Sequence, residues 1–237
     1  EAAALNNIGL FYADAGDLAY ALRHFERALA LRGQTGDVAG AAATLRNLGL
    51  VYSAQRDLVT ALSFFERALT LSQSAGDVLV EATTLNHLGW IDFTLGKHAK
   101  ALGYFERALL LSQKIEDVSS AANVLNNIGL VYKSLKEKNK ALSYHQRALI
   151  LIQQVGELRM EGITRDHIGS VLYELGRLPE AVRSFQAAAD CYVRANHLEA
   201  QEHRSLDRAL SIALFGQLAF DAQAILKSPC PIRDDGI

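Results

Sequence analysis

A repeat with a period of forty residues limits what this sequence can fold into more than any other feature. Glycine, alanine and phenylalanine each recur at that spacing. The glycine column is Gly9, Gly49, Gly89, Gly129 and Gly169. The alanine columns are Ala21, Ala61, Ala101, Ala141 and Ala181, and Ala28, Ala68, Ala108, Ala148 and Ala188. The phenylalanine column is Phe25, Phe65, Phe105 and Phe185, with His145 in the fourth place. Such a period is typical of solenoids, in which each unit buries its apolar face against the next.

Two helices are expected in each unit. Apolar residues recur at i, i+3 and i+7, as at Leu45, Leu48 and Tyr52. Between units stand Gly-Asp pairs at 36–37 and 76–77, replaced by Glu-Asp at 116–117 and Gly-Glu at 156–157. Glycine can end a helix in the left-handed conformation, aspartate can cap the next helix, and Pro179 suits a first helical turn. We therefore expect antiparallel helices, at roughly 38–55 and 58–75 in the second unit.

Five units and a weaker sixth pair account for the chain. We place the units near 1–37, 38–77, 78–117, 118–157 and 158–197. We interpret 198–227 as a degenerate sixth helix pair that covers the end of the stack, and 228–237 as a polar tail. Because the sequence starts inside the repeat pattern and without methionine, we expect a domain of a longer protein.

The repeat resembles that of the tetratricopeptide repeat family. The matching signature positions are Leu5, Ile8, Gly9, Tyr12, Ala21, Phe25 and Ala28, and the resemblance covers about 200 residues in five copies. The long forty-residue unit is similar to those of Leu-Gly-Asn (Pins) adaptors, kinesin light chains and bacterial arrays fused to CHAT proteases or signalling NTPases. The resemblance implies an all-α, right-handed superhelical α-solenoid, here of about twelve helices, whose first helices line a concave groove.

Composition narrows the function classes. The chain is 50% hydrophobic with a formal net charge of −2, which argues against nucleic acid or a membrane surface as partner. No apolar run is long enough for a membrane helix, and no signal peptide is evident, so we expect a cytoplasmic protein. The histidines lack metal-ligand spacing, and no nucleophile motif or phosphate loop occurs. Cys191 stands in a leucine column and is expected to be buried. We predict no enzyme, no metal and no cofactor.

A polar column on the first helices is the main candidate site. Its members are Asn7, Asn47, His87, Asn127 and His167. A carboxamide matches the donor and acceptor of a peptide unit. Helices about 10 Å apart would place one such side chain every three residues of an extended peptide. We expect the column to bind a ligand backbone. The alternative is that these side chains bond neighbouring helices and hold the repeats in register.

Other candidates flank that column. They are Arg46, Asn86, Trp90, Phe93, Asn126, Lys133 and Tyr173. Trp90 and Phe93 form the only large aromatic pair one turn apart on this face, and we expect an anchor pocket there. Asp92 stands in a column otherwise held by tyrosines, which suggests a locally weakened helix contact.

Three functions fit this pattern. The first is a protein–protein interaction module that binds a peptide or partner segment, or another segment of its parent chain, in the concave groove. The second is a regulatory or sensor array of a CHAT-type protease or a STAND-type NTPase. The third is a structural scaffold or self-association surface. The sequence names no partner and predicts no oligomeric state.

Overall fold

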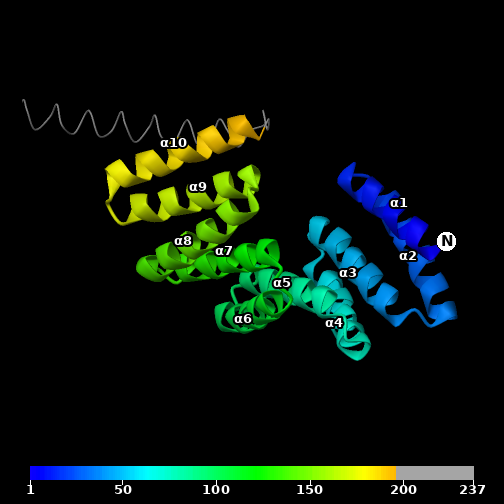
Figure 1. Ribbon diagram of the computed structural model, residues 1–237. Helices are drawn as coiled ribbons and strands as arrows, with labels where there is room; N and C mark the ends of the chain where they lie inside the picture. Colours follow the sequence, from blue (N-terminus) through cyan, green and yellow to red (C-terminus); the bar gives the residue numbers. More distant parts are fainter. Residues whose placement is uncertain (196–237) are drawn as a thin grey trace, which may run out of the picture. The chain divides into compact units, whose positions relative to one another are not determined.

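Ten helices and no strand make up residues 1–195, the part of the chain that this computed structural model describes (Figure 1). The helices are α1 (Ala2–Asp14), α2 (Leu18–Thr35), α3 (Val38–Ala54), α4 (Leu58–Ala75), α5 (Val78–Thr94), α6 (His98–Lys114), α7 (Val118–Ser134), α8 (Lys138–Val155), α9 (Leu158–Glu174) and α10 (Leu178–Arg194). The prediction of an all-α solenoid is confirmed. The expected helices at 38–55 and 58–75 correspond to α3 and α4. The predicted sixth pair at 198–227 and the tail at 228–237 lie outside the described residues.

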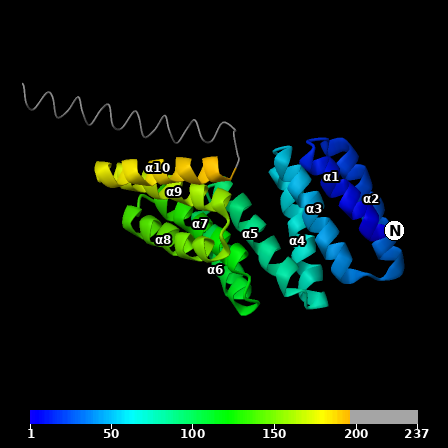
Figure 2. The same ribbon diagram turned by 45° about the horizontal axis from the view of Figure 1, so that its top comes forward.

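The chain divides into two compact units. The first, Glu1–Leu135, contains α1 to α7, and the second begins at Lys136 with α8, α9 and α10 in its described part. In the first unit α1 packs on α2, α3 on α4 and α5 on α6, and each second helix packs on the next first helix (Figure 2). The first helices α1, α3, α5 and α7 also contact one another in sequence. In the second unit α9 packs on both α8 and α10.

The helix ends follow the turn residues. The carboxylate of Asp37 accepts a hydrogen bond from the Gly40 amide at 2.9 Å and caps α3. Equivalent caps begin the helices at Asp17, Asp57, Asp77 and Asp117. Gly36 ends α2 with a φ of 70°, in the left-handed region that glycine adopts without strain. The predicted Gly-Asp punctuation is confirmed, as is Pro179 in the first turn of α10. At the variant Gly-Glu junction, α9 has no side-chain cap.

The glycine column makes room for the phenylalanine column. A Cβ atom added at Gly49 would lie 2.7 Å from Cε1 of Phe65. The same relation joins Gly9 to Phe25, Gly89 to Phe105 and Gly169 to Phe185. Real Cβ atoms do not approach that closely, so any larger residue would force the ring away. At these four positions the column glycine thus fits the first helix against the ring of its partner helix. The alanines of the second helices are fully buried beside them.

Candidate functional site

Amide pairs join successive first helices in the first unit. Nδ2 of Asn47 on α3 donates to Oδ1 of Asn6 on α1 at 3.0 Å. Nδ2 of Asn127 on α7 donates to Oδ1 of Asn86 on α5 at 2.8 Å. We call these two hydrogen bonds rungs. Each rung ties a first helix to the first helix before it, so Asn47 and Asn127 of the predicted polar column are bonded inside the protein.

The hydrogen-bonding groups of Asn47 are occupied. Its side chain is only 2% exposed, and its Oδ1 accepts from Nη2 of Arg46 at 3.3 Å. Oδ1 of Asn6 also accepts from the Thr44 hydroxyl at 3.3 Å, and that hydroxyl accepts from Nη1 of Arg32 at 2.7 Å. A ligand backbone could bond Asn47 only by displacing these partners. The geometry at this position therefore corresponds to the alternative in which the amide holds repeats in register.

In the third forty-residue repeat, His87 takes the place of the amide. Its imidazole stacks on Phe65 with ring centroids 5.3 Å apart. Burial, together with the positive charge of Arg46, lowers the pKa of His87 to about 4, so the ring is neutral at pH 7. In the second compact unit, His167 packs against His145 with centroids 5.1 Å apart. The two histidines of the column thus contact aromatic rings of second helices.

An apolar column on the same helices remains open. Leu10 and Leu50 are each 37% exposed and Trp90 is 42% exposed. We call these three residues the apolar stripe. By contrast Leu88 and Ile91, which flank Trp90 in sequence, are fully buried. The stripe is surface that the repeat packing does not use.

The aromatic cluster around Trp90 extends the stripe. The rings of Trp90 and Phe93 lie 5.5 Å apart, and Phe93 lies 5.8 Å from the imidazole of His98. Nε2 of His98 and Oγ of Ser134 are 3.2 Å apart. The predicted pairing of Trp90 with Phe93 is therefore present. His98 was not predicted, although it replaces the leucines at Leu18, Leu58 and Leu178 in its column.

The remaining candidates differ in exposure. Asn7 is exposed, whereas Asn126 is buried. Lys133 is half-buried on α7. Tyr173 is 53% exposed on α9, in the second compact unit.

Asp92 has an ionic role that the sequence analysis did not foresee. Its carboxylate is fully buried and pairs with Nζ of Lys100 at 3.1 Å and Nζ of Lys97 at 3.6 Å. The hydrogen bond to Asp92 raises the pKa of Lys100. At the equivalent position of the first forty-residue repeat, Tyr12 stacks on Tyr20 with ring centroids 5.2 Å apart. An ion-paired cluster therefore replaces an aromatic one at this position of the repeat.

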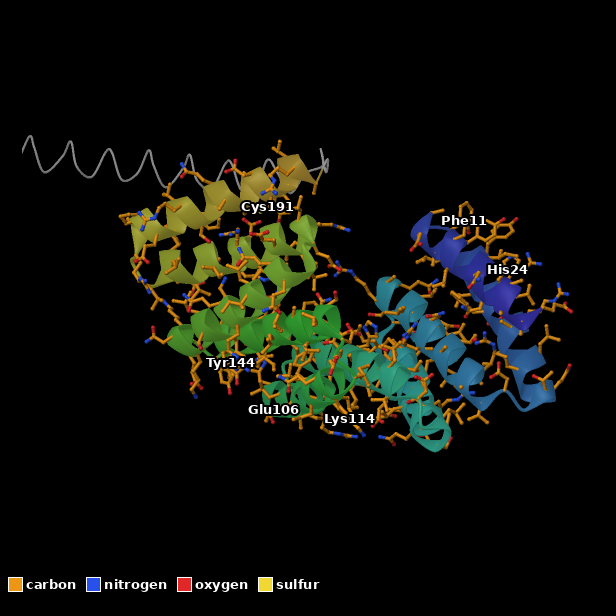
Figure 3. All side chains as sticks on the ribbon, in the orientation of Figure 1. Phe11, His24, Glu106, Lys114, Tyr144 and Cys191 are labelled. Carbon is orange, nitrogen blue, oxygen red and sulfur yellow. The ribbon has the colours of Figure 1, made fainter. Side chains whose placement is uncertain are left out.

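Within residues 1–195 no three His, Cys, Asp or Glu side chains come together as a metal-binding group. Cys191 lies on α10 (Figure 3). Its side chain is buried, and burial raises the pKa of its thiol. No helix of the described chain combines the length and apolarity needed to cross a bilayer.

The sequence and the fold agree with a known family. The tetratricopeptide repeat profile matches residues 1–74, 40–114, 80–154 and 120–194. These overlapping matches cover most of the 237 residues, and the chain belongs to the tetratricopeptide repeat family. Such an array is a protein–protein interaction module. A comparison with curated proteins found no match.

Solved structures of other proteins share the architecture. BtubC (BKLC) from P. vanneervenii is 25% identical, with a TM-score of 0.71 over 82% of this chain and 81% of that one. A Rap protein complexed with competence and sporulation factor is 15% identical, with a TM-score of 0.73 over 94% and 66%. Kinesin light chain-like TPR repeats from Podosopora anserina are 12% identical, with a TM-score of 0.65 over 81% and 95%.

Proposed function

We propose that this array binds a segment of a partner protein on the face formed by α1, α3 and α5, with the apolar stripe and Phe93 as its contact surface. The observation that carries the proposal is the exposure of Trp90 beside Phe93. Large aromatic side chains at binding surfaces often supply most of the binding free energy. The action is binding without catalysis, metal or cofactor, and the partner is a peptide or protein segment in the cytoplasm.

The scaffold favours such a role because the face is preformed. Rungs fix α3 against α1 and α7 against α5. The first helices α1, α3 and α5 are also packed on their partner helices α2, α4 and α6. A rigid surface loses little conformational freedom when a ligand binds, which raises affinity for a given contact area. The Rap protein complexed with competence and sporulation factor, which shares this fold, gives the proposal further support.

The test is a selection of displayed random twelve-residue peptides on the purified protein. Affinities of a selected peptide are then measured for the wild type, Trp90→Ala and Leu110→Ala by calorimetry. Leu110 is 66% exposed on the second helix α6, so its replacement controls for the loss of any exposed apolar side chain. We expect Trp90→Ala to weaken binding at least about tenfold, in the range of a binding hot spot. Equal affinity of all three proteins would place the site elsewhere.

A further inference from the structure

Two side chains of α1 are exposed at positions that the other first helices of the first compact unit bury. Ile8 is 41% exposed and Phe11 is 69% exposed. The equivalent residues of α3, α5 and α7 are all at most 2% exposed. They are Leu48, Leu88 and Ile128 in the column of Ile8, and Val51, Ile91 and Val131 in the column of Phe11. We call Ile8 and Phe11 the stacking face, because the later repeats stack on one another through these positions.

In the later repeats the second helix of the preceding repeat covers this face. Each buried cluster there contains an alanine and a phenylalanine, four residues apart on the second helix, and two large apolar residues of the next first helix. One cluster includes Ala21, Phe25, Leu48 and Val51, and the other includes Ala61, Phe65, Leu88 and Ile91. The alanine lets the two backbones approach, and the ring fills the space beside it. The complement of the stacking face is therefore a helix with a small and an aromatic residue four positions apart.

The described second helices of a neighbouring copy cannot supply this complement. Their column alanines are 0% exposed and their column phenylalanines are at most 2% exposed, because both columns are already packed inside the solenoid. The outer side of α4 carries Glu66 and Arg67, which are exposed. Covering apolar side chains with such groups would remove charges from water without a partner, which is costly. The occupant of the stacking face is therefore a helix whose apolar side is still free, and a partner protein can supply one.

Neighbouring rings hold Phe11 in place. Its ring centroid lies 5.7 Å from that of Tyr12, which in turn lies 5.5 Å from that of His24 on α2. Figure 3 shows Phe11 and His24 on this first helix pair. At the positions equivalent to His24, Phe64 and Tyr104 pack against the two buried clusters. The stacking face thus has an aromatic edge like the covered faces of the later repeats, and it loses little conformational freedom when a helix docks.

We propose that the stacking face binds an amphipathic helix of a partner protein, which carries a small residue and an aromatic residue four positions apart. The helix docks on α1 as α2 docks on α3, and it extends the solenoid by one layer. Since residues 36–37 alone join α2 to α3 and the two helices run antiparallel, the docked helix runs antiparallel to α1. Burial of Ile8 and Phe11 drives the association. The surface is distinct from the apolar stripe, and this inference does not depend on the proposed function.

The experiment titrates a helix of known fit into the protein. The probe is a labelled peptide with the sequence of residues 57–77, which contains α4 and its capping Asp57, and a staple between positions 66 and 70 keeps it helical. Both positions are exposed on α4, so the staple leaves the apolar side free. Fluorescence anisotropy measures its affinity for the wild type and for Phe11→Asp. We expect at least about tenfold weaker binding to Phe11→Asp, because the new carboxylate would be buried against an apolar helix.

Two variants serve as controls. Leu110→Asp introduces the same carboxylate at a position that is 66% exposed on α6, and Trp90→Ala removes the largest side chain of the apolar stripe. Both should bind the peptide within about twofold of the wild type, because neither residue lies in the contact. Melting curves check folding, and Phe11→Asp should keep the wild-type melting temperature because Phe11 is already exposed.

A second comparison uses the wild-type protein alone with two altered peptides. One carries Ala61→Gln, since glutamine is a good helix former but is too large for the close approach of the two backbones. The matched peptide carries Ser63→Gln, at a position that is exposed on α4. We expect the Ala61→Gln peptide to bind about tenfold more weakly than the Ser63→Gln peptide. This comparison holds even if Phe11→Asp does not fold.

Each contrary outcome points to a different occupant or site. Absence of binding to the wild type would mean that the face takes no such helix, as it would if residues 196–237 already covered it. Equal affinity of Phe11→Asp would place the peptide elsewhere, for example in exchange for α4. A wild-type dimer that Phe11→Asp abolishes, seen by sedimentation without peptide, would make a second copy the occupant. Loss of binding in Trp90→Ala would move the helix to the apolar stripe, which overturns this inference and leaves the proposed function intact.

Discussion

Two neighbouring columns on the same first helices differ in how far their side chains are exposed to solvent. The polar column is closed at Asn47, which is buried and bonded to Asn6 and Arg46. The apolar column one turn further along is open, since Leu50 and Trp90 are more than a third exposed. The polar side chains were expected to bind a ligand backbone, and Trp90 and Phe93 were expected to form an anchor pocket beside them. The structure shows that a pair of amides can satisfy each other across repeats, which leaves an apolar surface for a partner.

The comparison is tested most strongly by Asn47→Ala. The substitution removes the rung to Asn6 and deprives Arg46 of an acceptor in a buried place. We expect the free energy of unfolding to fall by about 2–3 kcal/mol, from two lost hydrogen bonds and an unsatisfied buried group. Urea denaturation measures the change. Asn7→Ala is the matched control, because Asn7 stands in the same column but is exposed, and it should change stability by less than about 0.5 kcal/mol. Equal effects of the two variants would contradict a closed polar column.

The imidazole in the polar column predicts a pH dependence. The folded-state pKa of His87 is about 4, below the ordinary value of 6.5. The unfolded chain therefore binds a proton on His87 that the folded chain excludes, and stability falls as the pH decreases from 6.5 towards 4. Between pH 7 and pH 5 the loss should be about 2 kcal/mol. His87→Asn, which restores the amide found at Asn7 and Asn127, should flatten this part of the stability profile. A wild-type profile identical to that of the variant would show that His87 is not buried as a neutral ring.

The second rung, between Asn127 and Asn86, can be tested separately. Asn127→Ala removes the bond to Asn86 from a half-buried position, so we expect a loss of about 1 kcal/mol. The Asn47 and Asn127 rungs share no partner. Their effects should therefore add in the double variant, within about 0.5 kcal/mol by denaturant unfolding. A loss in the double variant much larger than the sum would show that the rungs form one cooperative network.

The helix pairs could be predicted because their signals are carried by single residues in fixed columns. Gly49 has no side chain because Phe65 occupies the space, and Asp37 caps its own helix. Both facts repeat at a shift of forty residues, which self-comparison finds directly. Residue size and turn chemistry thus sufficed for the fold.

Self-comparison of the sequence at a shift of forty residues does not reveal the rungs, because each rung joins residues of two different columns. Asn47 bonds Asn6, forty-one residues away, while a shift of forty aligns it with the exposed Asn7. Self-comparison likewise does not identify the partners of Asp92, because Lys97 and Lys100 lie across a turn and in other columns. Periodicity identifies equivalent residues, but contacts between repeats form between non-equivalent ones. The side chains of the candidate site therefore required the structure.

The smallest effect on stability is expected from Trp90→Ala. Trp90 contacts Phe93 at the surface, so truncation loses one ring contact and some buried area. Alanine is the better helix former, which offsets part of that loss, and the free energy of unfolding should fall by about 0.5 kcal/mol. Leu88→Ala is the matched comparison on the same helix, because Leu88 is fully buried and its truncation should cost about 2–5 kcal/mol. Both are measured by urea denaturation beside the peptide titrations. A Trp90→Ala variant as unstable as Leu88→Ala would mean that the indole belongs to the core, and that the apolar stripe is not free for a partner.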